Sequence, residues 1–137
     1  MDYYEVISDH FRKTIDHAVM AVDDLAKPIE LAAKLITREL ISGNKIMVCG
    51  LGVDRALANL FVVQSQSSLG GERPGLPMIL LMPSENHGER RNSIKNQFDA
   101  AIRSMGNVGD VLLCIDSDAS GSNLADLAAL ASSKEIT

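Results

Sequence analysis

The sequence predicts an α/β domain with a parallel sheet, because three short apolar runs alternate with segments of helical periodicity. The runs are uninterrupted, which is typical of strands buried on both faces, and they span residues 45–49, 78–82 and 111–115. A helical pattern follows each run, over residues 54–69, 94–105 and 123–133. Strands and helices that alternate with short loops favour right-handed crossovers, with helices on both faces of the sheet.

The N-terminal segment predicts two helices ahead of this core. Apolar residues at helical spacing give residues 3–25 one apolar face, and Pro28 is expected to end that helix and begin a second one. Ser42, Gly43 and Asn44 are expected to cap the second helix. We therefore expect residues 1–43 to form a helical oligomerisation arm and residues 44–137 to form the α/β core.

Composition limits the classes of function. The 137 residues are 46% hydrophobic and 23% charged, with a net charge of −5, as in one soluble domain large enough to fold without a metal or disulfide. Scattered Lys and Arg residues in an acidic chain argue against direct nucleic-acid binding. No apolar run approaches the ~20 residues of a membrane span, and the acidic N-terminus is unlike a signal peptide. A cytoplasmic protein without a membrane partner is expected.

The two cysteines, Cys49 and Cys114, each lie inside an apolar run. This placement predicts reduced, packed thiols on neighbouring strands, with burial rather than chemistry as their role.

A glycine loop follows the first predicted strand and opens the next helix. Gly50 and Gly52 precede Asp54 and Arg55, and backbone N–H groups at such a helix start can hold an anion. A purely structural turn is the other interpretation. Ligands of parallel sheets gather at the carboxyl ends of strands, here residues 50–55, 83–91 and 116–122.

Three motifs resemble the sugar isomerase (SIS) domain family over nearly the whole chain. They are Gly43-Asn44-Lys45-Ile46 leading to Cys49-Gly50-x-Gly52, then Glu72-Arg73-Pro74-Gly75-Leu76-Pro77, then Gly106-x-x-Gly109-Asp110-Val111-Leu112-Leu113-x-Ile115. Within the family, the chain resembles the phosphoheptose isomerases and the DnaA initiator-associating protein. The resemblance implies a flavodoxin-like three-layer fold, dimers or tetramers formed through the N-terminal helices, and a pocket for a sugar phosphate. The chain ends where a further strand would begin, so we expect a version shortened at the C-terminus or a sheet edge covered by a partner chain.

Departures from the family pattern fall on the phosphate loops. Family members resemble C-G-N-G-G-S at the first loop, and this chain has Asp54 where the serine would stand. Two unit charges about 4 Å apart repel by roughly 4 kcal/mol at an effective dielectric near 20. Asp54 is expected instead to cap the helix. The second family loop resembles S-T-S-G-N-S, and this chain carries two additional carboxylates there, Asp116 and Asp118. Ser117, Ser120 and Ser122 remain able to donate hydrogen bonds to a neutral sugar.

Positions that supply metal binding and acid/base chemistry in the family are replaced as well. They fall on Leu60, Val63 and Gln64, of which the first two neither ligate zinc nor transfer protons. We therefore predict no catalytic residue, no metal and no cofactor. The predicted ligand-binding positions are Gly50, Gly52, Asp54, Arg55, Ser117, Ser120 and Ser122.

Other polar groups leave alternatives open. Asp54, Asp116 and Asp118 are either a hard-cation site or solvated helix caps. His87, between Glu85 and Glu89, is either a pH-sensitive or catalytic imidazole or simply exposed. His10 and His17, on one helix face, are a candidate contact for a partner helix, and the pair Arg90-Arg91 is either a contact for an acidic partner or phosphate or a solvated surface.

The function predicted is that of a catalytically degenerate SIS domain, an oligomeric module that binds a sugar derivative or a protein such as DnaA. A working phosphoheptose isomerase, with sites shared between subunits, is the alternative.

Overall fold

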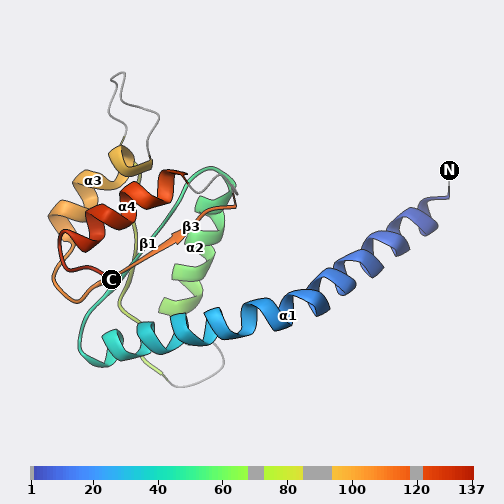
Figure 1. The fold of residues 1–137 in the computed structure, drawn as a ribbon, viewed down its shortest axis with the longest axis horizontal. Coiled ribbons are helices and arrows are strands. Elements are labelled where there is room, and N and C mark those ends of the chain that lie inside the picture. The colour runs from blue at the N-terminus through green and yellow to red at the C-terminus, as the bar shows by residue number, and fades with distance from the viewer. Residues whose placement is uncertain (1, 68–72, 85–93, 118–121) are drawn as a thin grey trace. The chain divides into compact units, whose positions relative to one another are not determined.

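The computed structural model describes residues 2–67, 73–84, 94–117 and 122–137. The elements, in chain order, are α1 (Tyr3–Ile41), β1 (Ile46–Gly50), α2 (Val53–Gln66), β2 (Met78–Leu80), α3 (Ile94–Met105), β3 (Val111–Ile115) and α4 (Ser122–Ser132) (Figure 1). The chain forms two compact units, which divide between Thr37 and Arg38. The first unit consists of α1 without its last turn, and the second holds the sheet.

The N-terminal segment is one continuous helix, so the predicted break at Pro28 is wrong. Proline removes one backbone donor, yet the helical apolar pattern continues on both sides of it, from Leu25 to Ile29. Ion pairs from Glu30 to Lys27, at 2.8 Å, and to Lys34 also span this turn, and such exposed pairs add a few tenths of a kcal/mol each. These pairs offset only part of the roughly 3 kcal/mol that an interior proline costs a helix.

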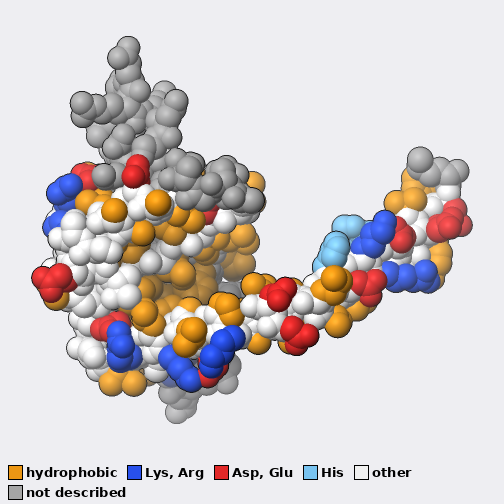
Figure 2. Space-filling view, in the orientation of Figure 1, with side chains coloured by type: hydrophobic (Ala, Val, Ile, Leu, Met, Phe, Trp, Pro, Cys, Tyr) orange, Lys and Arg blue, Asp and Glu red, His pale blue; other side chains and the backbone are white. Residues whose placement is uncertain are grey.

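No residue of α1 is buried within the chain. Figure 2 shows hydrophobic side chains on its surface along its length, among charged ones. The helix ends as predicted at Ser42, Gly43 and Asn44. Gly43 has a positive φ of 86°, and the N–H of Asn44 donates to the carbonyl of Glu39 at 3.0 Å, which closes the last turn.

The sheet is parallel throughout, with strand order β2-β1-β3. All five residues of the central strand β1 are buried, as the uninterrupted apolar run predicts. This order matches the first three strands of a flavodoxin-like sheet, whose ligands bind at the carboxyl ends of the first and third strands. That switch point lies between β1 and β3.

Helices cover the sheet on both faces. Met47 and Cys49 of β1 pack in one cluster with residues of α3 and α4, namely Phe98, Ile102, Leu127, Leu130 and Ala131. α3 and α4 lie side by side (Figure 1), and α2 packs against all three strands. The three-layer α/β fold predicted from the sequence is confirmed.

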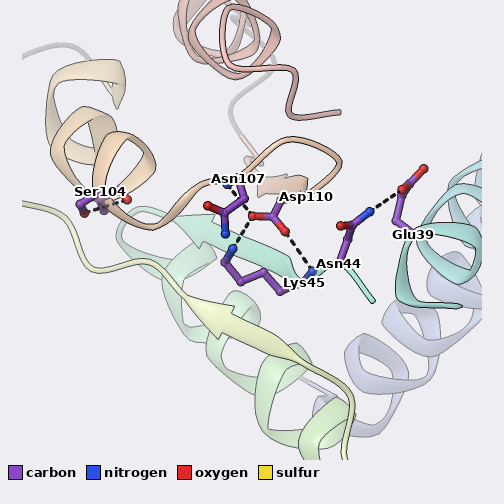
Figure 3. Close-up of polar contacts among 7 residues, drawn as sticks. Glu39, Asn44, Lys45, Ser104, Asn107 and Asp110 are labelled. Carbon is purple, nitrogen blue, oxygen red and sulfur yellow. Dashed lines mark hydrogen bonds and ion pairs between the residues drawn. The ribbon is translucent and has the colours of Figure 1, made fainter. Parts of the chain in front are cut away.

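A buried carboxylate joins the starts of β1 and β3. Asp110 is 2% exposed, and its oxygens accept hydrogen bonds from the N–H of Lys45 at 3.0 Å, the N–H of Asn107 at 2.7 Å and the ammonium of Lys45 (Figure 3). Burial alone would raise the pKa of Asp110, but these donors together outweigh it and hold the pKa below its ordinary value.

Thr137 forms backbone hydrogen bonds with the edge of β3 that faces away from β1. The N–H of Leu112 donates to the carbonyl of Thr137 at 2.8 Å, and the N–H of Thr137 donates to the carbonyl of Asp110 at 3.0 Å. This is the hydrogen-bond pattern of a parallel neighbour. Among the helices in the described part of the chain, none is both long and apolar enough to cross a membrane.

Candidate functional site

The glycine loop after β1 brings the chain into α2 by a tight turn. A Cβ on Gly50 would lie 2.7 Å from the backbone carbon and oxygen of Asp54, so only glycine lets the helix start so close to the strand. Gly52 has a φ of 56° and stands at the N-cap of α2. Each glycine is therefore required by the backbone path, and the two together place Asp54 in the first turn of the helix.

The side chain of Asp54 does not cap its own helix, so the N-cap prediction is wrong. Its Oδ2 instead accepts two hydrogen bonds from Ser117 in the loop after β3, from the backbone N–H at 3.0 Å and from the hydroxyl at 3.1 Å. Asp54 is 8% exposed. The carboxylate thus crosses from the end of β1 to the end of β3, at the switch point of the sheet.

The second oxygen of this carboxylate has a different environment. Asp54 Oδ1 is buried and has no hydrogen-bond partner among the residues that the structure describes. An unpaired buried oxygen costs about 1 to 3 kcal/mol. Because a carboxylate oxygen accepts hydrogen bonds and carries negative charge, the arrangement favours a ligand group that donates a hydrogen bond over one that is itself negatively charged.

The remaining predicted site residues are not all gathered around Asp54. Arg55 points to the β2 side, where its guanidinium lies 3.3 Å from the sulfur of Met82. It lines a shallow cavity of about 460 Å³ together with Gly52, Ala56, Asn59, Leu80 and Met82. Ser122 is the first residue of α4, and Ser120 lies outside the described residues. The structure therefore unites Asp54 with Ser117 and places Arg55 at a neighbouring cavity.

Two of the three positions expected to bind metal in the family, Leu60 and Val63, carry no metal-binding group, and the third is Gln64, at best a weak oxygen donor. Leu60 and Val63 are 51% and 52% exposed on α2. Within the described ranges, no three His, Cys, Asp or Glu side chains lie close enough together to hold a metal ion. Asp118 of the proposed cation cluster lies outside those ranges, as do Glu85, His87, Glu89, Arg90 and Arg91. His10 and His17 lie on the exposed α1.

The two cysteines lie on neighbouring strands, as predicted, and stand opposite each other near the ends of β1 and β3. Their Sγ atoms are 2.8 Å apart and share a hydrogen bond. That hydrogen bond, together with burial, raises the pKa of the Cys49 thiol, and the same hydrogen bond lowers the pKa of Cys114. Sequence reasoning missed this contact between the sulfur atoms, because strand neighbours are visible in a sequence but side-chain directions are not.

Comparison with known proteins agrees with this fold. The SIS domain profile matches residues 10–137. The chain is 30% identical to a phosphoheptose isomerase of Pseudoalteromonas atlantica, over 97% of this chain and 69% of that protein. It is 29% identical to the DnaA initiator-associating protein DiaA of Klebsiella pneumoniae, over 93% and 66%.

A solved structure of a phosphoheptose isomerase has the same fold. A phosphoheptose isomerase from Francisella tularensis superposes with a TM-score of 0.81 at 25% identity, over 100% of this chain and 73% of that one. The chain thus spans between about two thirds and three quarters of the length of these relatives. It belongs to the SIS domain family.

Proposed function

We propose that this chain is a catalytically degenerate SIS domain, an oligomeric module that binds a sugar derivative or a protein partner. One observation carries the proposal: the Asp54 carboxylate accepts hydrogen bonds from both donors of Ser117. Ser117 lies in the loop whose family counterpart wraps a phosphate, so the protein's own carboxylate already uses donors that a phosphate would need.

Electrostatics add to this competition. A phosphate seated about 4 Å from Asp54 would be repelled by roughly 4 kcal/mol per charge at an effective dielectric near 20. Each 1.4 kcal/mol changes affinity about tenfold, so the penalty is on the order of a thousandfold. A neutral or hydroxyl-rich sugar group does not incur this penalty and could donate to Asp54 Oδ1.

The acid/base and metal-binding groups that isomerisation would need are also missing from two positions among the described residues. Leu60 and Val63 stand at the positions where the family resemblance places acid/base and metal-binding side chains, and neither transfers a proton. This supports a binding role over a catalytic one. We place the module in the cytoplasm, where free thiols such as Cys49 and Cys114 are kept reduced.

The exposed apolar face of α1 supports assembly into a homodimer or homotetramer. Large apolar side chains at steps of three and four residues along the helix are each more than half exposed: Tyr4, Ile7, Phe11, Ile15, Val19, Val22, Leu25 and Ile29. A second copy of α1 would cover such a stripe. The DnaA initiator-associating relative makes DnaA a candidate protein partner.

The alternative is a phosphoheptose isomerase that acts on sedoheptulose 7-phosphate, with residues contributed by neighbouring subunits. The names of the 30% identical relatives favour it. In that case Asp54 would have to release Ser117 when the sugar phosphate arrives.

A melting-temperature screen separates the two functions. We expect millimolar sedoheptulose 7-phosphate to leave the melting temperature of the wild type unchanged and to raise that of Asp54→Ser by several degrees. Asp126→Ser, which removes an exposed carboxylate of α4, is the matched control and should behave as the wild type. A wild-type shift of several degrees would overturn the degenerate site, and ketose to aldose conversion by the wild type would establish the isomerase.

A further inference from the structure

We propose that Cys49 and Cys114 form a reversible disulfide when the protein meets a peroxide, and that they constitute a redox-sensitive modification site. This inference does not depend on the proposed function, because it rests on the position of the two thiols in the sheet.

The geometry of the sheet prepares the two residues for bonding. Cys49 and Cys114 are partners in register on neighbouring parallel strands, so their side chains leave the same face of the sheet. Neighbouring strands lie about 4.8 Å apart, which falls inside the range of Cα separations found in disulfides, roughly 4.4 to 6.8 Å. Their Sγ atoms are already 2.8 Å apart. A rotation of the side chains, with little backbone movement, brings the sulfur atoms to bonding distance.

The two thiols differ in how accessible they are to a solvent-borne oxidant, and this difference determines which one reacts with the oxidant first. Cys49 is fully buried, whereas Cys114 is partly exposed and lines an apolar cavity of about 300 Å³ together with Leu112, Leu124 and Leu127. A small oxidant such as hydrogen peroxide fits this cavity. The hydrogen bond from Cys49 lowers the pKa of Cys114, which favours its reactive thiolate. Cys114 therefore reacts first, and Cys49 follows.

The reaction balances in two steps. The Cys114 thiolate attacks one peroxide oxygen, so that the O–O bond breaks, an S–O bond forms, and hydroxide leaves and takes up a proton as water. The sulfur is oxidised to a sulfenic acid and the peroxide is reduced. The Cys49 sulfur then attacks the sulfenic sulfur, forming the S–S bond, while the S–O bond breaks and a second water leaves with the thiol proton. A dithiol reductant reverses the change by exchange.

Such a bond would tie together the strand ends that carry the candidate site. Cys49 directly precedes Gly50 of the glycine loop, and Cys114 lies three residues before Ser117. Oxidation would therefore fix the spacing between the two loops that Asp54 bridges.

Peptide mapping of the whole chain tests the proposal. The protein is treated with hydrogen peroxide, unfolded in the presence of N-ethylmaleimide and digested with trypsin. We expect the wild type to lose the mass of two hydrogen atoms, to take up no N-ethylmaleimide, and to yield peptide 46–55 joined to peptide 104–134. Treatment with dithiothreitol before alkylation should restore two labelled thiols. Two thiols still alkylated after peroxide, or a disulfide found only between chains, would overturn the proposal.

Two single variants test the assigned roles. In Cys49→Ser, peroxide should leave a Cys114 sulfenic acid that dimedone captures, and in Cys114→Ser the buried Cys49 should stay alkylatable. Capture of dimedone at Cys49 in the second variant would contradict the order of reaction. Circular dichroism confirms that each variant is folded, and the wild-type mapping decides the proposal even where a variant is not.

Discussion

Lys45 supplies two of the donors that hold Asp110, its backbone N–H to Oδ1 and its ammonium to Oδ2. The two residues stand at the starts of β1 and β3, and the side chains of Lys45 and Asp110 are only 20% and 3% exposed. A partly buried pair that also links two strands through the backbone differs from the exposed pairs on α1, since water competes little for its charges.

Asp110→Asn should destabilise the protein by about 3 kcal/mol. The variant removes the negative charge that pairs with the largely buried ammonium of Lys45 and leaves that ammonium without a counter-charge. Urea unfolding at neutral pH measures the loss. Asp99→Asn, which removes a more exposed partner of Arg103 in α3, is the control and should cost less than about 1 kcal/mol. Equal costs for the two variants would contradict the account of the buried pair.

The same carboxylate predicts how stability depends on pH. Because the pKa of Asp110 in the folded protein lies below its ordinary value, its contribution is complete above the unfolded pKa of about 4. That contribution is lost as the pH falls through the folded pKa. The difference in unfolding free energy between the wild type and Asp110→Asn should therefore shrink below about pH 4. A difference that stays constant down to low pH would contradict the sign of the shift.

Two glycines with the same positive φ form a matched test of crowding. Gly43 and Gly109 both have a φ of 86°, but a Cβ on Gly43 would meet nothing within 4 Å, whereas one on Gly109 would lie 2.6 Å from the Asn44 amide nitrogen. Gly43→Ala should cost about 1 kcal/mol for the backbone conformation alone. Gly109→Ala should cost at least about 1 kcal/mol more, because Asn44 must also move and give up its hydrogen bond to Glu39. Equal melting temperatures would rule out the clash.

Ser117→Ala removes the hydroxyl that donates a hydrogen bond to Asp54 Oδ2. Because a hydrogen bond to a charged group contributes about 1.5 to 3 kcal/mol, we expect a loss in this range by chemical denaturation. Ser104→Ala is the control, since its hydroxyl donates only to the carbonyl of Ala101 within the same helix, and it should be nearly neutral. A neutral Ser117→Ala would mean that the hydroxyl does not hold the Asp54 carboxylate in solution, which would leave only the backbone N–H of Ser117 to link the two loops.

Assembly through α1 is tested by one charge on its apolar stripe. Phe11→Lys should shift the oligomer toward monomers in sedimentation velocity, because burial of a lysine in an apolar interface is costly. Asp16→Asn changes the net charge by the same amount on the exposed helix and should sediment as the wild type. If both variants and the wild type share one sedimentation coefficient, α1 is not the interface.

Sequence patterns predicted the fold well, because uninterrupted apolar runs mark buried parallel strands wherever they lie. The start of β1 was predicted within one residue, and the whole of β3 as observed. The break at Pro28 was wrong because a proline removes one hydrogen bond from a helix without necessarily ending it, and the helical apolar pattern continues on both sides of Pro28.

The candidate site was predicted only in part. The sequence indicates both Asp54 and Ser117 as site residues. It predicts that Asp54 caps its own helix, because the backbone N–H groups of that helix are the only donors whose proximity to Asp54 can be inferred from the sequence. Its actual partner is 63 residues away and becomes a neighbour only when β3 pairs with β1. For the same reason the contact between the Cys49 and Cys114 sulfur atoms could not be read from spacing.

The amide resonance of Ser117 in a ¹⁵N–¹H correlation spectrum reports most directly on whether Asp54 occupies the anion loop. During a titration with sedoheptulose 7-phosphate to millimolar concentration, we predict that this resonance stays in place in the wild type and moves saturably in Asp54→Ser. A saturable movement in the wild type would contradict the account, since it would show that the sugar phosphate reaches a donor that the carboxylate is said to hold.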